Sequence, residues 1–180
     1  GSAIATGLAE NAKVTKLSIP ATIKNGKAKV KVVGIEVGAF AGNDAIKSVT
    51  IGSNVTEIGE RAFLRCGKLT RVSFGKSVEK IGNEAFKNCA ALKTATLPQN
   101  LTEIGQCAFM NTALTKAVLQ KKTVAVGAEA FCNIRTLKTV TIKADAANIG
   151  EEAFEGHADG AVFKFSTKDS AKKAEMIRMI

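Results

Sequence analysis

Apolar residues recur along this chain with a period of about 23 residues. The dipeptide Ala-Phe occurs six times, and consecutive copies are separated by 23, 23, 23, 22 and 23 residues. A period of this length is typical of a solenoid, in which successive repeats stack as coils. The copies stand at 39–40, 62–63, 85–86, 108–109, 130–131 and 153–154.

Each unit combines two apolar patterns. An alternating segment such as Val72-Ser73-Phe74 predicts a strand with one buried face. An Ile-Gly-x-x-Ala-Phe segment, as in 81–86, places apolar residues at i, i+4 and i+5 and favours one helical or 3₁₀ turn. One unit cannot bury its apolar side alone. We therefore expect strands of successive coils to pair in parallel, about 4.8 Å apart, around an internal column of six Phe side chains.

The N-terminal end of the array carries a different pattern. Alternating apolar residues flank Asn25-Gly26 and predict a β-hairpin cap over about 14–37, because Asn and Gly tolerate the positive φ that a tight hairpin turn needs. Residues 1–13, which open with Gly1-Ser2, a remnant of cloning, are expected to be a disordered or extended lead-in.

The C-terminal end is expected to be a second cap. Residues 161–166 alternate and predict a last strand, so the solenoid is expected to cover 14–166. Apolar residues in 167–180 predict a short helical cap, with Ser166 or Thr167 as its N-cap.

The unit resembles the BspA-type leucine-rich repeat, which is built on I-G-x-x-A-F-x-x-C followed by L-x-x-V-x-I-P. The segments 81–89 (IGNEAFKNC) and 92–98 (LKTATLP) match it closely, whereas Glu36 replaces the first Gly and the unit after Phe109 is one residue shorter. The resemblance covers about 14–166. It implies a mainly β, right-handed leucine-rich-repeat β-solenoid with a parallel sheet and short helical turns. It also implies a secreted or surface-attached bacterial protein, often adhesive toward host proteins or glycans.

The alternation also identifies the outward-facing residues of the predicted sheet. They are Ser, Thr, Lys and Arg, with no acid and no aromatic residue, and solenoids often bind partners through such a surface. Thr is also simply favourable on an exposed strand, so a plain solvated face stays open. The candidate ligand-binding residues are Lys16, Lys47, Thr50, Arg71, Ser73, Lys93, Thr94, Thr96, Lys116, Lys138, Thr139, Thr141 and Lys164.

Composition narrows the choice of partner. The 180 residues include 26 Lys and Arg against 16 Asp and Glu, which gives a net charge of +10. Residues 13–31 alone hold six Lys and no acid. This charge favours acidic partners, although Lys also keeps sheet edges soluble. Trp and Tyr are absent, which argues against nucleic acid as the partner, because base-stacking platforms need aromatic rings.

No constellation of residues indicates an enzyme, a cofactor or a metal site. The segment 74–77 (FGKS) resembles the end of a phosphate-binding loop, but Thr70 stands where that loop needs Gly. The only histidine, His157, falls in the column of Cys66 and Cys89, which favours a structural role. We expect these two cysteines to be buried free thiols, although the coil spacing also permits a disulfide.

Taken together, these features predict a non-enzymatic binding or adhesion module of a secreted or surface-attached bacterial protein. Its sheet face is expected to recognise a host protein or an acidic glycan, and the chain is expected to be a monomer. No run of about 18 apolar residues occurs, so we expect no membrane insertion. The alternative is a structural spacer within a larger surface protein, with no ligand of its own.

Overall fold

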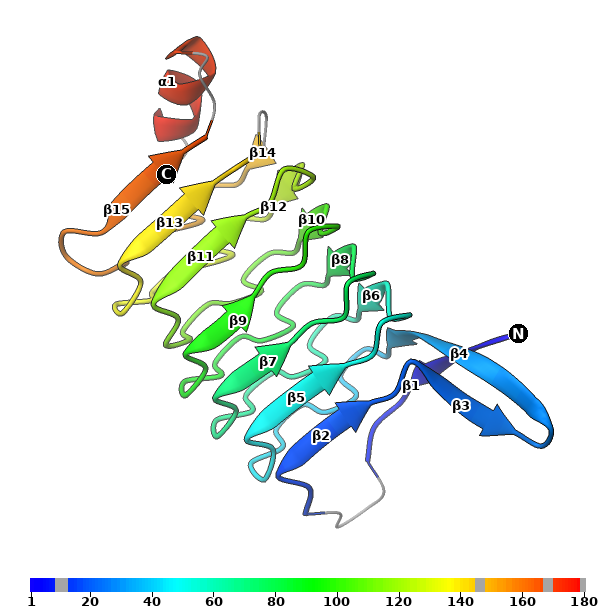
Figure 1. Cartoon of the computed structure of the whole chain (residues 1–180). Helices are drawn as coiled ribbons and strands as arrows, with labels where there is room; N and C mark the ends of the chain where they lie inside the picture. The colour runs from blue at the N-terminus through cyan, green and yellow to red at the C-terminus, as the bar shows by residue number, and fades with distance from the viewer. Residues whose placement is uncertain (9–12, 145–147, 167–169, 179–180) are drawn as a thin grey trace.

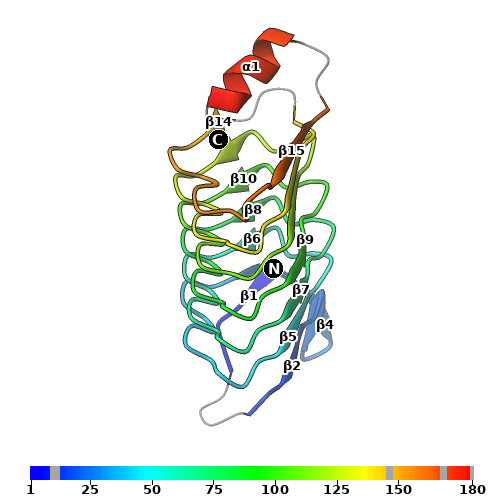
Figure 2. The ribbon, with the colours of Figure 1, turned by 90° about the vertical axis from the view of Figure 1, so that its left-hand side faces the viewer.

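The computed structural model describes residues 1–8, 13–144, 148–166 and 170–178. Each repeat forms one coil, and the coils stack into an elongated solenoid of about six turns (Figures 1 and 2). Parallel strands run along two of its sides. The predicted β-solenoid is therefore confirmed in its main features.

The first sheet contains the strands that the alternating segments predict. It consists of two hydrogen-bonded ladders, and in both the coils pair at the predicted register, for example Val49 with Val72 and Val140 with Phe163. The first ladder comprises β2 (Lys16–Ile19), β5 (Ser48–Ile51), β7 (Arg71–Ser73) and β9 (Thr94–Thr96), and the second comprises β11 (Lys116–Leu119), β13 (Thr139–Ile142) and β15 (Val162–Phe165).

The second sheet has no counterpart in the sequence-based expectations. It starts with β1 (Ser2–Ala5) and β4 (Ala28–Ile35) and continues through five strands of two residues each. Each short strand ends at the buried Ile or Val of the Ile-Gly motif, and two residues are too few for an alternation to be recognised. These strands are β6 (Glu57–Ile58), β8 (Lys80–Ile81), β10 (Glu103–Ile104), β12 (Ala125–Val126) and β14 (Asn148–Ile149).

The Ala-Phe segments form turns, so the predicted helical turn is wrong. Arg61 and Arg65 have φ values of 55° and 58°, in the left-handed region, and such residues interrupt a right-handed helix. As a result, successive N–H groups point in alternate directions. The N–H of Phe63 donates to the carbonyl of Ala85 in the next coil at 2.8 Å, whereas the N–H of Leu64 donates to the carbonyl of Arg61 within its own coil at 3.0 Å.

The six phenylalanines of the Ala-Phe motif form the predicted internal column. Neighbouring ring centroids lie 5.1 to 5.3 Å apart, and the ring planes are within 15° of parallel. At the C-terminal end Phe163 closes the column, because its ring meets Phe154 edge-on at 5.8 Å. The column is therefore covered by a residue of β15.

The glycine of the Ile-Gly motif marks a very close approach between coils. A Cβ atom on Gly105 would lie 2.5 Å from the backbone nitrogen of Asn83, and the equivalent distances at Gly127 and Gly150 are both 2.4 Å. The atoms that these Cβ atoms would meet first belong to the backbone of the preceding coil. Any side chain at this position therefore forces neighbouring coils apart.

The predicted hairpin is present at the N-terminal end. Strand β3 (Thr22–Asn25) pairs antiparallel with β4. Its turn is Gly26-Lys27, one residue later than predicted, and Gly26 supplies the positive φ of 61°. Residues 23–29 are exposed, and the hairpin projects from the side of the first coil (Figure 1), so its role as a cap is not confirmed. Residues 2–5 of the predicted lead-in form β1, which pairs in parallel with β4.

The predicted helical cap is wrong in its role. A helix, α1 (Ser170–Arg178), follows β15, but it lies beyond the last coil (Figure 2). Its apolar residues Ala171, Ala174 and Ile177 are exposed, so they do not cover the core. Thr167, one of the two predicted N-cap residues, lies outside the described residues.

Removing one ring from the middle of the column should be costly. Phe86 is fully buried and stacks on a ring at both sides. We expect Phe86→Ala to lower the free energy of unfolding by about 3–5 kcal/mol, because it leaves a cavity that the coils cannot close. Urea unfolding followed by circular dichroism measures this. Ile23→Ala in the exposed hairpin is the control and should change stability by less than about 0.5 kcal/mol.

Adding a methyl group at the close approach should also destabilise the fold. Gly105→Ala should lower the thermal unfolding midpoint, because backbone must move to admit the Cβ atom. Gly34→Ala is a matched control, because the added Cβ atom would lie an ordinary 3.7 Å from the nearest atom, the carbonyl oxygen of Glu57. The φ angle of Gly34 is not positive. Equal midpoints for the two variants would contradict this account of the Ile-Gly motif.

Candidate ligand-binding face

All thirteen predicted face residues lie on the outer side of the first sheet or directly before its strands. Eleven of them are exposed, and Thr139 and Thr141 are half-buried. The register places Lys16, Ser48, Arg71 and Thr94 in one row across β2, β5, β7 and β9. The sheet thus brings the predicted residues together on one face, whereas ligand binding by them stays a prediction.

Each coil contributes one cation to this face. From Lys16 to Lys138 the cations alternate between the first residue of a strand and the residue just before it, so those of neighbouring coils are not directly opposite. Lys164 is instead the third residue of β15 and lies beside Thr141. Cations of the same row are two coils apart, roughly 10 Å at the usual strand spacing. This offset limits the repulsion that like charges in register produce. The series is Lys16, Lys47, Arg71, Lys93, Lys116, Lys138 and Lys164.

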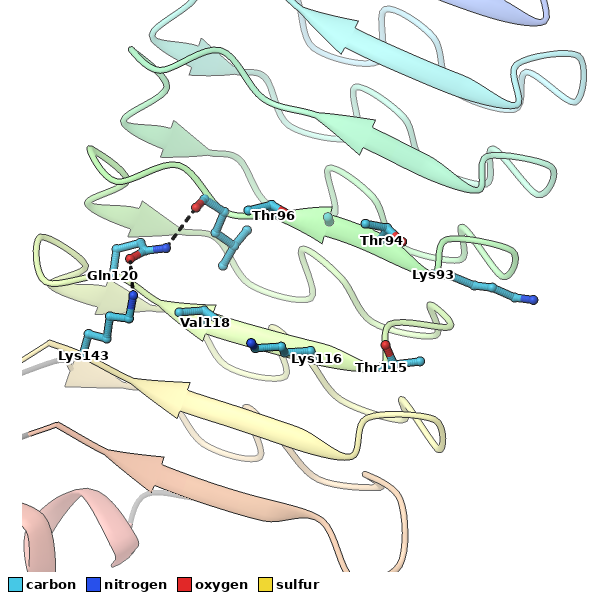
Figure 3. A pocket seen from close by; sticks show the side chains of 10 residues that line it. Lys93, Thr94, Thr96, Thr115, Lys116, Val118, Gln120 and Lys143 are labelled. Atoms are coloured by element: carbon cyan, nitrogen blue, oxygen red, sulfur yellow. Dashed lines mark hydrogen bonds between the residues drawn. The ribbon is translucent and has the colours of Figure 1, made fainter.

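A groove interrupts the face between β9 and β11 (Figure 3). Within the described residues no backbone hydrogen bond joins these two strands, and a depression of about 340 Å³ lies there. A neighbouring depression of about 740 Å³ extends over β7 and shares Thr94, Thr96 and Gln120 with it. The sequence did not predict this groove, although the one-residue deletion between Phe109 and Leu114 stands directly before β11.

Polar side chains at one end of the groove hold each other in place. The side-chain amide of Gln120 donates from Nε2 to the carbonyl of Leu97 at 3.2 Å. Lys143 in turn donates from Nζ to Oε1 of Gln120 at 3.5 Å (Figure 3). Lys93 and Thr115 stand at the other end, and Lys116 lies along β11 between Thr115 and Val118 (Figure 3).

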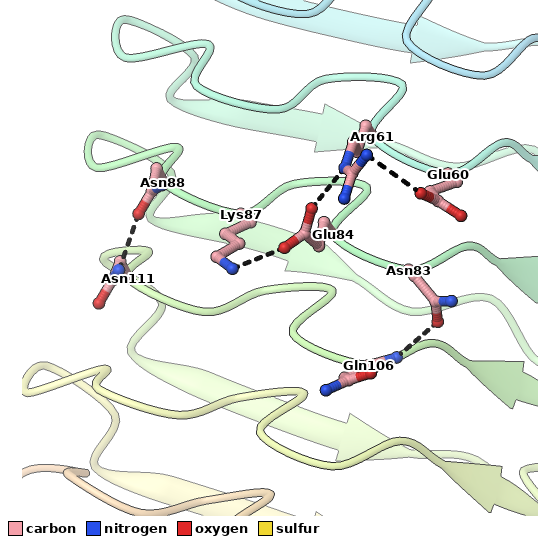
Figure 4. Close-up of polar contacts among 8 residues, drawn as sticks. All are labelled: Glu60, Arg61, Asn83, Glu84, Lys87, Asn88, Gln106 and Asn111. Carbon is pink, nitrogen blue, oxygen red and sulfur yellow. Dashed lines mark hydrogen bonds and ion pairs between the residues drawn. The ribbon is translucent and has the colours of Figure 1, made fainter.

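Glu60 and Glu84 form ion pairs on a different side of the solenoid, among the turns (Figure 4). The carboxylate of Glu84 accepts hydrogen bonds from Lys87 at 2.6 Å and from Arg61 at 2.5 Å. These two cations hold the pKa of Glu84 below its usual value. In the part of the chain that the structure describes, no Lys or Arg of the sheet face takes part in an ion pair.

The cysteines behave as predicted. Cys66 and Cys89 are fully buried free thiols, and each donates from Sγ to a backbone carbonyl at 3.1 Å, that of Phe40 and of Phe63 respectively. The hydrogen bond with Cys66, together with burial, raises the pKa of the Cys89 thiol. The same contact lowers the pKa of Cys66, and both thiols act as structural donors between coils.

The remaining candidates for chemistry are structural as well. His157 Nδ1 lies 3.0 Å from the carbonyl oxygen of Ala158, and its ring packs edge-on against Phe163. No group of three or more His, Cys, Asp or Glu side chains that could hold a metal ion occurs within the described residues. Across the same residues, none of the helices is long and apolar enough to cross a membrane.

Comparison with known proteins places the chain in a family. A model of the BspA type leucine rich repeat region matches residues 33–161 in six copies, so the chain belongs to this family. A leucine-rich repeat protein from Bacteroides ovatus is 30% identical with a TM-score of 0.71, over 82% of this chain. The T. pallidum leucine rich repeat protein is 23% identical with a TM-score of 0.71, over 93% of this chain and 84% of its own.

A third solved structure, a leucine-rich repeat protein from Bacteroides capillosus, is 25% identical with a TM-score of 0.59, over 79% of this chain and 88% of its own. The present chain spans only 39% of the Bacteroides ovatus protein. No curated protein sequence matches it. The comparisons therefore establish the family and the fold.

The thiols should differ in reactivity according to burial. A maleimide added to the folded protein should label the partly exposed Cys132 and leave Cys66 and Cys89 unlabelled until the protein unfolds. Burial raises the pKa of Cys132, so its labelling should still be accelerating above pH 8.5 as thiolate forms. Mass spectrometry of tryptic peptides locates the label. Early labelling of Cys89, or a disulfide between it and Cys66, would contradict this assignment.

Proposed function

We propose that this chain is a non-enzymatic binding module of a secreted or surface-attached bacterial protein. It presents the sheet face to an acidic partner, which is a segment of a host protein or an acidic glycan. One observation supports this proposal above the others. Every coil places a Lys or Arg on this face, none of these cations forms an ion pair within the described residues, and the rows of the face contain no acid.

The mechanism is multivalent electrostatic attraction. A single exposed Lys contributes little, because water and salt screen its charge. A series of cations held at fixed spacing acts together, since the first contact raises the local concentration of the acidic groups that follow. The stacked coils hold the strands rigidly, so little conformational entropy is lost when these contacts form. Thr and Ser hydroxyl groups between the cations supply hydrogen bonds.

The bacterial and extracellular parts of the proposal rest on the family. The chain has the BspA-type repeat throughout residues 33–161, and the structures it resembles belong to bacterial leucine-rich repeat proteins.

Retention on a heparin column tests the proposal. The wild-type protein should bind at low ionic strength and elute as salt rises, because counterions screen the face. The variant Lys47→Gln/Arg71→Gln/Lys93→Gln removes three cations of the face and should elute at clearly lower salt. The control Lys24→Gln/Lys27→Gln/Lys29→Gln removes the same charge from the exposed hairpin and should elute close to the wild type.

Two results would count against the proposal. If the wild type is not retained at low ionic strength, the face does not bind polyanions, and the spacer interpretation is favoured. If the hairpin variant loses as much retention as the face variant, the net charge rather than the sheet face is responsible.

A further inference from the structure

We infer that the groove between β9 and β11 is the specific subsite of the sheet face, and that it takes a sulfated segment of a saccharide. This inference rests on the proposed function and names both the place and the chemical class of ligand. The lining residues that carry it are Lys93, Thr94, Thr96, Lys116, Gln120 and Lys143.

The groove coincides with the one irregular unit of the array. Leu114 stands five positions after Phe109, whereas the equivalent residue of a complete unit stands six positions after its Phe, as Leu92 does after Phe86. In the complete coil that contains β13, the N–H of Lys138 donates to the carbonyl of Thr115, directly before the paired residues of β11 and β13. In the shortened coil the N–H of Ala113 donates to the carbonyl of Leu92 instead, and no backbone hydrogen bond follows between the described strands β9 and β11.

The core beneath the groove is also smaller than elsewhere. Val49, Val72 and Val140 occupy the inward-facing position of other strands, but β9 and β11 have Ala95 and Ala117 there. Ala95 is half-buried and forms part of the groove lining. The depression over the break has a volume of about 340 Å³, within the range of pockets that hold small ligands.

Three kinds of polar group converge on this depression. Lys93 and Lys143 stand at its two ends and Lys116 on the side of β11, so all three bring positive charge to its lining (Figure 3). The hydroxyl groups of Thr94 and Thr96 offer donors and acceptors at the side of β9. Within the described residues, the backbone edges of β9 and β11 face the gap without pairing with each other.

The lining favours a sulfated saccharide over other acidic ligands. It contains no aromatic ring on which a neutral sugar could stack, and it lacks the Trp, Tyr and Arg anchors that dominate protein interfaces. It also lacks the planar guanidinium group that matches a carboxylate in bidentate fashion. Lys ammonium groups are compact point charges, which suit the equivalent oxygens of a tetrahedral sulfate. Hydroxyl and amide groups suit the saccharide hydroxyls beside it.

The experiment is titration calorimetry with a heparin-derived hexasaccharide, using two matched variants. Lys93→Gln/Lys116→Gln removes two cations of adjacent coils across the groove. Lys16→Gln/Lys47→Gln removes two cations of adjacent coils where the ladder is continuous. The groove variant should raise Kd by at least about tenfold, because it loses charged hydrogen bonds. The comparison variant belongs to the same face and should also weaken binding, but by no more than about threefold, since it loses only screened long-range attraction.

Two further arms test the class of ligand. An unsulfated acidic polysaccharide, hyaluronan, and a poly-glutamate peptide should each bind much more weakly than the sulfated hexasaccharide. The uncharged variant Thr94→Val should weaken hexasaccharide binding without changing the salt dependence, because it removes only a hydroxyl group. Circular dichroism checks that every variant retains the fold.

The outcomes separate this inference from the proposed function. If both double variants lose affinity equally, the groove is not a subsite, although the face still binds acidic ligands. If poly-glutamate or hyaluronan binds as tightly as the hexasaccharide, the assignment to sulfated saccharides is wrong. If the wild type binds none of the three probes, the proposed function itself fails. Loss confined to the groove variant and to the sulfated probe supports the inference.

Discussion

The spacing between coils is the constraint on which this structure depends. Backbone hydrogen bonds between parallel strands require about 4.8 Å, and the phenylalanine rings of successive coils stack with centroids 5.1 to 5.3 Å apart. Hydrogen bonding and ring stacking can be satisfied together only if nothing else separates the coils. Glycine follows the buried Ile for this reason, and the Ala beside each Phe, fully buried in five of the six units, is small for the same reason.

The same spacing organises the polar groups. Because equivalent residues of successive coils lie side by side, a hydroxyl or amide group can bond a carbonyl one coil away. Thr56 donates to the carbonyl of Val33, Thr102 to that of Glu79, and the amide of Asn111 to Oδ1 of Asn88 (Figure 4). Within the described residues, no buried side-chain nitrogen or oxygen lacks a hydrogen-bond partner. The Cys thiols extend this arrangement into the core, where they donate to carbonyls that water cannot reach.

The sequence predicted those parts of the fold that a repeated type of side chain marks in every coil. Six Ala-Phe pairs at one period predicted the coils, the ring column and the rows of the sheet face. The backbone conformation of the turns could not be predicted. Arg and Glu rarely adopt a left-handed φ, so Arg61 and Glu84 gave no sign of one, and helical turns were predicted instead. The two-residue strands of the second sheet, β6, β8, β10, β12 and β14, were not predicted, because two residues are too few to show an alternation of apolar and polar positions. The deletion after Phe109 was visible in the sequence, but its effect on the β9–β11 ladder depends on three-dimensional register.

The left-handed residues also make the coils interdependent. Nine non-glycine residues of the described chain, among them Glu84, Cys107 and Glu129, have positive φ values near 55°. Each costs about 1 kcal/mol or more relative to ordinary backbone, so an isolated coil would relax out of this shape. Eight of the nine direct their N–H group to a carbonyl of the next coil, and these hydrogen bonds help to hold the conformation in place. Such an array behaves as a one-dimensional cooperative system, in which intrinsically unstable units are stabilised by coupling to their neighbours. A single coil has no fold of its own, and stability grows with the number of coupled interfaces.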